Sequence, residues 1–486
     1  MLDCAKVSNG YSLRTAASPR PPAPPRPETG TQSLPEVFRS IAVPRTGSWL
    51  RRFLAFAGPG YLISVGYMDP GNWGTDLAGG SRFGYTLLWV ILASNLMAQF
   101  LQVLAARLGL VTRKDLAMAC RDYYRKPAAL AMWLLCEIAI IACDLAEVVG
   151  SAVALNLLFG MPLQLGVLLT AADVLLLLAF LRFGFRKIEA IVLTLVLTVF
   201  GCFVYEIFLA GPDPGAVLRG ALIPMMPNTE ALLISLGILG ATVMPHNLYL
   251  HSSIVQTRHT DEGDGALRHA IHANTIDTIV ALSLAFFVNA AILVLAASVF
   301  AASGTIVTEL QQGHELLHLA LGGASATAFA VALLASGQAS TITGTLAGQI
   351  VMEGFLRLRI TPWLRRIITR SLAIVPALFI IHATGGKDTV QLLVISQVVL
   401  SLQLPFAIFP LMMVTSDRRR MGKYANPRWA TVLGYGICTL IAALNVFLLY
   451  SVVGALWVSV AVGLVVAFAV YAKYIYKDTR LQPTPN

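Results

Sequence analysis

Long apolar runs separated by short polar loops recur along the chain from residue 53 almost to the C-terminus. A run of about 20 apolar residues is long enough to cross the ~30 Å hydrocarbon core of a membrane as an α-helix. The pattern predicts twelve membrane-spanning helices, with approximate limits 53–78, 85–110, 128–158, 162–181, 188–210, 230–256, 273–301, 323–355, 367–385, 389–415, 429–450 and 453–475. We therefore expect an all-α polytopic membrane protein.

Composition excludes an ordinary soluble protein. Hydrophobic residues make up 57% of the 486 residues and charged residues only 12%, whereas soluble domains have about 45–50% and about 25%. Residues 1–50 differ from the rest, because they contain a proline-rich run at 19–27 and no apolar core of a signal peptide. We expect a disordered cytoplasmic tail there and a shorter one at 476–486, with the first span acting as its own insertion signal.

The positive charges of the chain lie on alternate loops. The loops after the second, fourth, sixth, eighth and tenth spans hold five, three, two, five and five Lys or Arg residues, whereas the other loops hold only Arg82, Arg219 and Lys387. Basic loops remain on the cytoplasmic side, so both termini are expected to be cytoplasmic in a multi-pass protein of the cell (inner) membrane. Because the net charge of +10 is explained by orientation, no nucleic-acid partner is expected.

Two spans contain a proline next to polar residues near mid-membrane. The first carries Asp69-Pro70-Gly71-Asn72, and the sixth carries Met244-Pro245-His246-Asn247. Proline lacks an amide donor and disfavours the α conformation of the preceding residue, so these helices should unwind at Asp69 and Met244. Interrupted helices at matching places in two halves are typical of a transporter's central site.

The two breaks each begin a block of five spans. This spacing predicts a five-plus-five inverted repeat, in which the odd number of spans gives the halves opposite orientations. The first repeat would cover residues 51–210 and the second residues 229–415, with two additional spans at 429–475.

The residues at the breaks offer a mixed set of metal ligands. Asp69 provides a carboxylate, Asn72 an amide oxygen and Met244 a thioether, and the unwound backbone around Gly66 and Ala241 can add carbonyl oxygens. Magnesium and calcium sites normally use oxygen alone, so the thioether favours a transition metal such as Mn²⁺, Fe²⁺, Co²⁺ or Cd²⁺. The ligands do not rank these ions.

Further charged residues inside the spans indicate a proton route. Carboxylates and histidines in a membrane interior commonly form proton relays, and the candidates are Glu137, Asp144, Glu147, His246 and Asp69, with Arg365 and Arg366 as partners for the carboxylates. Asp144 and Glu147 are three residues apart and share a helix face. For Asp173 and Asp277, helix-end or packing roles are as plausible as a functional one.

Taken together, these motifs resemble the NRAMP family of proton-coupled divalent metal transporters. The resemblance rests on Asp-Pro-Gly-Asn at 69–72, Met-Pro-His at 244–246, the segment 144–147 and the sequence surrounding 241–252, and it covers residues 50–450. It implies a LeuT-like fold and metal–proton symport, with no cofactor beyond the transported Mn²⁺ or Fe²⁺ and H⁺, by a monomer in contact with membrane lipid. It also implies Gln397 as an extra ligand in an occluded state. The proline-rich tail lies outside the family pattern.

Three other classes of protein compete with this interpretation. His314-Glu315-Leu-Leu-His318 matches the HExxH motif of zinc proteases, but it lies in a loop between spans, where Leu316 and Leu317 are expected to rest on the membrane surface. A sodium-coupled transporter of organic solutes is disfavoured by the anionic Asp69 in the centre of the site. A channel would need rings of like groups along a continuous pore, and no such pattern occurs.

Overall fold

The computed structural model describes residues 38–42, 56–170, 185–259, 263–301, 303–358, 360–454, 458 and 463. The chain divides into a unit at Met1–Thr31 and a unit at Gln32–Asn486, and every described residue belongs to the second. Most of the predicted N-terminal tail, the second half of the predicted span 162–181, nearly all of the predicted span 453–475 and the C-terminal tail lie outside the described residues.

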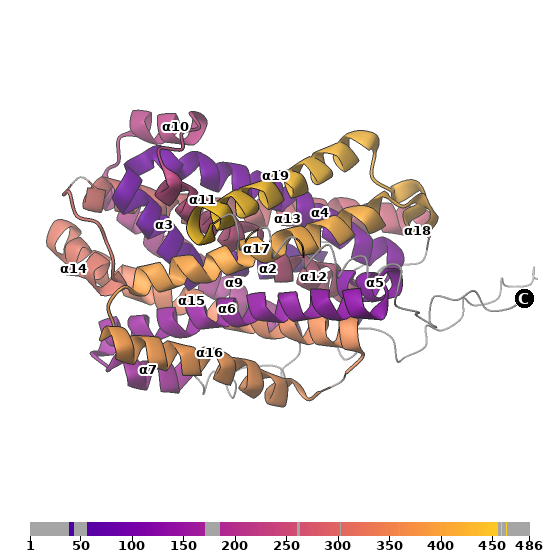
Figure 1. The fold of residues 1–486 in the computed structure, drawn as a ribbon, viewed down its shortest axis with the longest axis horizontal. Coiled ribbons are helices and arrows are strands. Elements are labelled where there is room, and N and C mark those ends of the chain that lie inside the picture. The colour runs from indigo at the N-terminus through magenta and orange to yellow at the C-terminus, as the bar shows by residue number, and fades with distance from the viewer. Residues whose placement is uncertain are drawn as a thin grey trace, which may run out of the picture. The chain divides into compact units, whose positions relative to one another are not determined.

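Helices make up almost all of the described secondary structure (Figure 1). The α-helices are α2 (Pro59–Gly66), α3 (Pro70–Phe83), α4 (Leu88–Thr112), α5 (Leu116–Tyr123), α6 (Lys126–Phe159), α7 (Leu163–Leu169), α9 (Phe185–Ala210), α10 (Pro214–Leu222), α11 (Thr229–Val243), α12 (Pro245–Ile254), α13 (Asp264–Leu295), α14 (Leu310–Leu321), α15 (Gly323–Leu356), α16 (Pro362–Thr384), α17 (Thr389–Ser416), α18 (Arg418–Met421) and α19 (Arg428–Val453). Shorter elements are η1 (Gly84–Leu87), η3 (Val255–Thr257), η4 (Ala296–Ala301), η5 (Gly422–Tyr424) and the strands β1 (Ile41–Ala42) and β2 (Arg258–His259).

Nine helical segments within the described residues are long and apolar enough to cross a membrane. They correspond to the predicted spans except in three places. One segment, Pro70–Thr112, contains both the end of the first predicted span and the second predicted span, because only the short turn η1, with Gly84 at a φ of 58°, separates α3 from α4. The second half of the predicted span 162–181 and nearly all of the predicted span 453–475 lie outside the described part. The prediction of an all-helical membrane protein is confirmed at this level.

Both predicted helix breaks are present. The helix α2 ends at Gly66 and α3 begins at Pro70, with Asp69 in extended conformation as the N-cap of α3. The helix α11 ends at Val243 and α12 begins at Pro245, with Met244 between them at a φ of 40°. The two prolines each occupy the first position of a helix, where their missing amide donor costs nothing.

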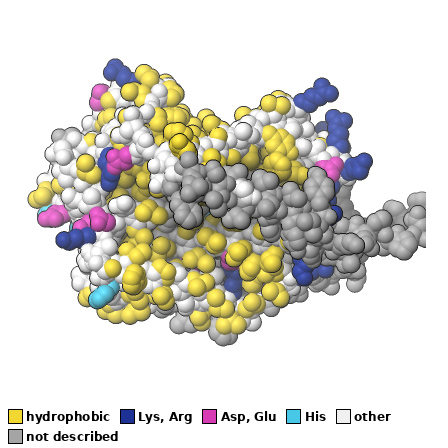
Figure 2. All heavy atoms as spheres, in the orientation of Figure 1, with side chains coloured by type: hydrophobic (Ala, Val, Ile, Leu, Met, Phe, Trp, Pro, Cys, Tyr) yellow, Lys and Arg dark blue, Asp and Glu magenta, His cyan; other side chains and the backbone are white. Residues whose placement is uncertain are grey.

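The broken helices pack against the longest helices of the unit. The helix α3 contacts α6, α11, α13 and α17, and α6 in turn packs along α15 and α17 (Figure 1). Large apolar side chains such as Phe208, Leu319 and Phe379 are more than 70% exposed on the outside. Figure 2 shows hydrophobic side chains over much of the middle of the visible face and most Lys and Arg side chains toward its ends. This distribution is typical of a protein surrounded by lipid.

Candidate metal-binding site

The carboxylate of Asp69 lies in the gap between α2 and α3 and is fully buried. One of its oxygens, Oδ1, accepts a hydrogen bond of 2.9 Å from the backbone amide of Asn72, which caps the first turn of α3. The other, Oδ2, accepts a hydrogen bond of 3.4 Å from the thiol of Cys143 on α6. Each oxygen has lone pairs left for a cation.

Two backbone carbonyls, one at each break, have lost their usual helical donors. Gly66 and Ala241 each stand four residues before a proline, Pro70 and Pro245 respectively. In a regular helix the residue four positions later donates to each carbonyl, but proline has no N–H. The Gly66 oxygen accepts only a longer bond of 3.3 Å from the amide of Asp69. Both carbonyls lie at the C-terminal ends of helices, where the helix dipole is negative and favours a cation.

The thioether of Met244 lies beside the first break. A Cβ atom on Gly66 would stand 3.0 Å from the Met244 sulfur, so the two breaks meet closely because Gly66 has no side chain. The same sulfur lies 3.4 Å from Nδ2 of Asn247. The φ of 40° at Met244 is a conformation that side chains rarely adopt, and such strain is common at functional sites.

Two amide side chains complete the surroundings. The side chain of Gln397, on α17, lies against Gly71, because a Cβ on that glycine would overlap the amide. Asn72 and Gln397 are buried, and their amide oxygens have no hydrogen-bond partner among the described residues. Because buried polar atoms are nearly always paired, these two oxygens are candidates to bind an ion.

The site is suited to a metal held by mixed donors. Within the described residues, no three His, Cys, Asp or Glu side chains are grouped so that they could hold a metal ion. The donors at the two breaks are instead a carboxylate, amide and carbonyl oxygens and a thioether. Asp69, Asn72, Met244 and Gln397 are all at most 1% exposed, so these side chains are closed off from solvent.

A row of carboxylates runs along α6 from the site and is paired with arginines of α16. The guanidinium of Arg370 lies 3.1 Å from Glu147 Oε2 and 3.9 Å from Asp144 Oδ1. Farther along, Arg365 lies 3.1 Å from Glu137 Oε2. We refer to Glu137, Asp144 and Glu147 as the carboxylate row.

The arginine prediction was only partly correct. Arg365 does contact the carboxylate row, at Glu137, but Arg370 is the arginine that reaches Asp144 and Glu147. The side chain of Arg366 lies outside the described residues. The sequence analysis did not propose Arg370 as a partner of these carboxylates. It lies one turn inside the predicted span 367–385, and an arginine within a span usually faces the protein interior, so this position was the signal that could have identified it.

His246 is buried at the second break. Its side chain is 3% exposed, and its Nδ1 has no hydrogen-bond partner among the described residues. It follows Pro245 in the first turn of α12, so the break that places Met244 also places His246.

We call the end of the unit where the basic loops lie the basic end. Charged side chains hold the start of α2 there. Arg258, after α12, donates to the carbonyls of Phe56 and Ala57 at 2.8 Å each. Arg258 also pairs with Glu189 of α9 at 2.7 Å, with both side chains fully buried. Arg186 binds Glu189 at 2.8 Å and Ala57 at 2.9 Å. We call these contacts the α2 clasp.

Asp277 belongs to the same clasp. Its Oδ2 accepts hydrogen bonds from the amides of Gly58, at 3.3 Å, and Gly60, at 2.7 Å, at the start of α2. Asp277 therefore caps a helix that its own helix, α13, packs against, which is a helix-end role. The strands β1 and β2 pair in parallel beside it, with Ile41 opposite Arg258.

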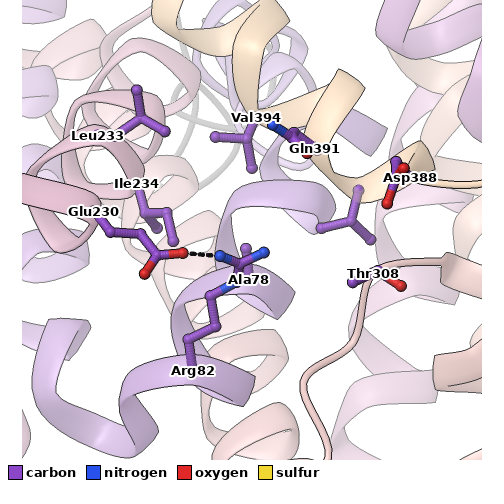
Figure 3. Close-up of a pocket in the computed structure, with 10 residues that line it drawn as sticks. Ala78, Arg82, Glu230, Leu233, Ile234, Thr308, Asp388, Gln391 and Val394 are labelled. Atoms are coloured by element: carbon purple, nitrogen blue, oxygen red, sulfur yellow. Dashed lines mark hydrogen bonds and ion pairs between the residues drawn. The ribbon is translucent and has the colours of Figure 1, made fainter. Parts of the chain in front are cut away.

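A cavity of about 120 Å³ lies at the opposite end of α3 and α11. Figure 3 shows it between these helices, the start of α17 and the preceding loops. Its lining residues are Ala78, Arg82, Glu230, Leu233, Ile234, Thr308, Asp388, Val390, Gln391 and Val394. Arg82 of α3 and Glu230 of α11 form an ion pair at its wall. The three helices that line the cavity also carry Asp69, Ala241 and Gln397.

The HExxH segment forms part of α14, at the cavity end of the unit. His314 is half-buried, which lowers its pKa together with the nearby His318, and Glu315 and His318 are exposed. The expectation that Leu317 rests on the membrane surface was wrong, because Leu317 is fully buried in the protein core. The amphipathic helix is therefore held by packing.

The family model described as "Natural resistance-associated macrophage protein-like" matches residues 60–451. The chain belongs to the Nramp family. It is a multi-pass membrane protein of a transporter family and not an enzyme. The resemblance stated from the motifs is thus confirmed.

Curated Nramp relatives match most of the chain. A divalent metal cation transporter MntH of Mesorhizobium japonicum is 55% identical over 431 residues, covering 88% of this chain and 95% of the relative. A divalent metal cation transporter MntH of Nostoc is 56% identical over 435 residues, covering 89% and 98%.

Solved structures agree on the fold. The manganese transporter of Eremococcus coleocola matches with a TM-score of 0.82 and 39% identity, over 90% of this chain and 97% of that chain. The inward-facing conformation of Mhp1 matches with a TM-score of 0.55 and 14% identity, over 90% and 94% of the two chains, and indicates a shared fold alone.

Proposed function

We propose that this Nramp protein is a symporter that imports divalent transition-metal ions into the cytoplasm together with protons, by alternating access. The transported ions would be Mn²⁺ and Fe²⁺, with Co²⁺, Cd²⁺ and Zn²⁺ as further substrates. The names of the relatives, which are transporters of divalent metal cations and of manganese, support this proposal.

One observation carries the proposal: the buried carboxylate of Asp69 lies at the first break, and the thioether of Met244, at the second break, lies beside Gly66 of the first. Asp69, Asn72 and Met244, the carbonyls of Gly66 and Ala241 and, less directly, Gln397 would bind the metal. The thioether makes the site unlike the all-oxygen sites that Mg²⁺ and Ca²⁺ prefer. Selection against these abundant ions would follow from Met244.

The distribution of contacts supports movement of the broken helices. The α2 clasp closes the basic end, whereas a cavity lies beside α3 and α11 at the other end. Ala78 lines this cavity nine residues after Asp69, which is about 13 Å along a helix. We propose that the cavity is the outer vestibule and that inward opening requires release of the clasp. The basic end would be cytoplasmic.

The architecture proposed for this movement is a LeuT-like five-plus-five inverted repeat. The repeats would be 51–210 and 229–415, followed by two further spans and cytoplasmic tails, in a protein that acts as a monomer in lipid. The broken helices α2–α3 and α11–α12 would be the equivalent first helices of the two halves.

Protons would use the carboxylate row. Asp69 and Glu147 lie on either side of the Cys143 thiol, at 3.4 and 4.0 Å from its sulfur. From there Asp144 and Glu137, with Arg370 and Arg365, extend toward the basic end. Together with His246 these groups would carry protons beside the path of the metal.

The membrane potential favours import. Each elementary charge that crosses the whole field gains about 2.3 kcal/mol per 100 mV when the cytoplasm is negative. A divalent ion therefore gains about twice as much, before any contribution from protons.

Binding of Mn²⁺ to the purified protein tests the proposed site. Titration calorimetry should detect Mn²⁺ binding to the parent protein that excess Ca²⁺ or Mg²⁺ does not displace. Asp69→Ala should weaken it by more than about a hundredfold, since loss of outer-shell partners alone costs about 10–100-fold. Equal affinity in the parent and in Asp69→Ala would contradict the assignment.

A further inference from the structure

We infer that Cys143 places a second sulfur atom beside the transported ion and shifts the selectivity of the site toward soft ions, Cd²⁺ above all. The inference rests on the proposed function, because it concerns the same site. It assigns a specificity-determining role to Cys143, a residue that the sequence analysis did not single out.

The geometry places Cys143 at the carboxylate. The residue lies on α6 and is 4% exposed. Its sulfur lies 3.4 Å from Asp69 Oδ2, the oxygen that faces away from the helix cap, and 4.0 Å from Glu147 Oε1. Cys143 and Met244 belong to one small buried cluster with Ala139 and Leu400. An ion held by Asp69 and Met244 would thus be bound within reach of a thiol.

Independent polar atoms mark the same place as an ion site. The amide oxygens of Asn72 and Gln397 are buried, belong to helices that meet at the break, and have no partner among the described residues. Such oxygens are rare in protein interiors. Cys143 is therefore adjacent to a set of cation ligands and is not an isolated thiol.

Sulfur ligands discriminate between metal ions. Soft thiol and thioether ligands favour soft ions, whereas Mn²⁺ is satisfied by carboxylate and carbonyl oxygens. A site with two sulfur atoms should therefore bind Cd²⁺ better, relative to Mn²⁺, than a site with one. A serine at position 143 would replace the sulfur by oxygen while keeping a hydrogen-bond donor for Asp69.

The chain offers a matched control on the same helix. Cys136 lies seven residues before Cys143, is fully buried and packs in the main hydrophobic core. Cys136→Ser makes the same chemical change without altering the surroundings of Asp69.

The test compares parent, Cys143→Ser and Cys136→Ser in two measurements. Competition between Cd²⁺ and Mn²⁺ for uptake into proteoliposomes gives the selectivity ratio. Cadmium NMR of the purified proteins reports whether sulfur binds the ion, and it needs no transport. We expect Cys143→Ser to lower the ratio of Cd²⁺ to Mn²⁺ by about tenfold or more and to move the cadmium resonance toward oxygen ligation. Cys136→Ser should resemble the parent.

The outcomes separate this inference from the proposed function. An unchanged selectivity ratio and an unchanged cadmium resonance in Cys143→Ser would overturn the role of Cys143, while the parent still transports metal. If Cys143→Ser fails to transport, the cadmium resonance of the purified variant, compared with that of the parent, tests the role of Cys143 without uptake data. A parent protein that neither binds nor transports Mn²⁺ or Cd²⁺ would instead overturn the proposed function itself.

Discussion

At the scale of single residues, Met244 combines strain with chemistry. Its φ of 40° costs on the order of 1–3 kcal/mol in a residue with a side chain. The strained conformation places the sulfur beside Gly66, where a larger residue would not fit. We therefore attribute the role of Met244 to its thioether, which this conformation brings beside the first break.

Replacing Met244 tests this role. Met244→Ala should still transport Mn²⁺ but should lose its discrimination against Ca²⁺ and Mg²⁺ on the order of tenfold, which corresponds to about 1.4 kcal/mol. Uptake of the three ions into proteoliposomes measures the ratio. Met412→Ala is the control, because Met412 is a fully buried methionine that packs against Gly434, away from the break. If the Met244→Ala protein still rejects both Ca²⁺ and Mg²⁺, the thioether does not determine the selectivity of the site.

Arg370 compensates the charge of the buried carboxylates Asp144 and Glu147. It pairs with Glu147 and contacts Asp144 and Thr341, all deeply buried. Removing one partner of a buried ion pair costs about 3–5 kcal/mol. Arg370→Ala should therefore lower the thermal unfolding temperature in detergent clearly more than Arg419→Ala, which alters an exposed side chain. Equal unfolding temperatures for the two variants would show that the carboxylates do not need this arginine.

The site residues differ in how far the sequence could predict them. Asp69, Asn72 and Met244 could be predicted as a group because proline marks the local break and they stand next to it. Cys143, Arg370 and the orientation of Gln397 could not, because their positions depend on how α6, α16 and α17 pack against the breaks. Gln397 entered only through the family resemblance.

At the scale of elements, the short helix α2 is held at its start by charged side chains. It has only eight residues, so its position depends on its contacts more than on its own stability. The α2 clasp connects α2 to the helices α9 and α13 and to the segment after α12.

Weakening the clasp should favour inward opening. Glu189→Gln removes the charge that Arg186 and Arg258 share. A cysteine introduced at the buried Ile63 of α2, in a background without native cysteines, should then react with a thiol reagent from the basic end on the order of tenfold faster, as expected from about 1.4 kcal/mol of lost stabilisation.

Glu206→Gln is the matched control for this experiment. Glu206 is a buried glutamate of the same helix, near its other end, and has no hydrogen-bond partner among the described residues. It should leave the reactivity at position 63 unchanged. If Glu189→Gln also leaves it unchanged, the clasp does not hold the basic end closed.

The elements themselves were largely predictable, and the exceptions have physical causes. Length and hydropathy locate most spans within a few residues. The sequence did not reveal how closely α4 follows α3, because only the four residues of the 3₁₀ turn η1 separate them, with Gly84 at a φ of 58°. Nor did it predict the β1–β2 pair, which forms between segments more than 200 residues apart.

At the scale of the whole molecule, the two ends of the unit are unequal. The basic end carries the α2 clasp, and the other end carries the cavity with the Arg82–Glu230 pair. The side chains of the proposed metal site are at most 1% exposed. A transporter that alternates between two accessible states needs such a closed arrangement between them, and the two broken helices connect both ends to the site.

The central claim is that this site moves transition metals together with protons. The most direct test is uptake of Mn²⁺, Ca²⁺ and Mg²⁺ into proteoliposomes with a negative interior, while a dye inside reports pH and Asp69→Ala serves as the control. The account predicts that Mn²⁺ enters, that the alkaline earth ions do not, and that the interior acidifies in the parent protein only. Equal Mn²⁺ entry in the parent and in Asp69→Ala, or entry without acidification, would contradict it.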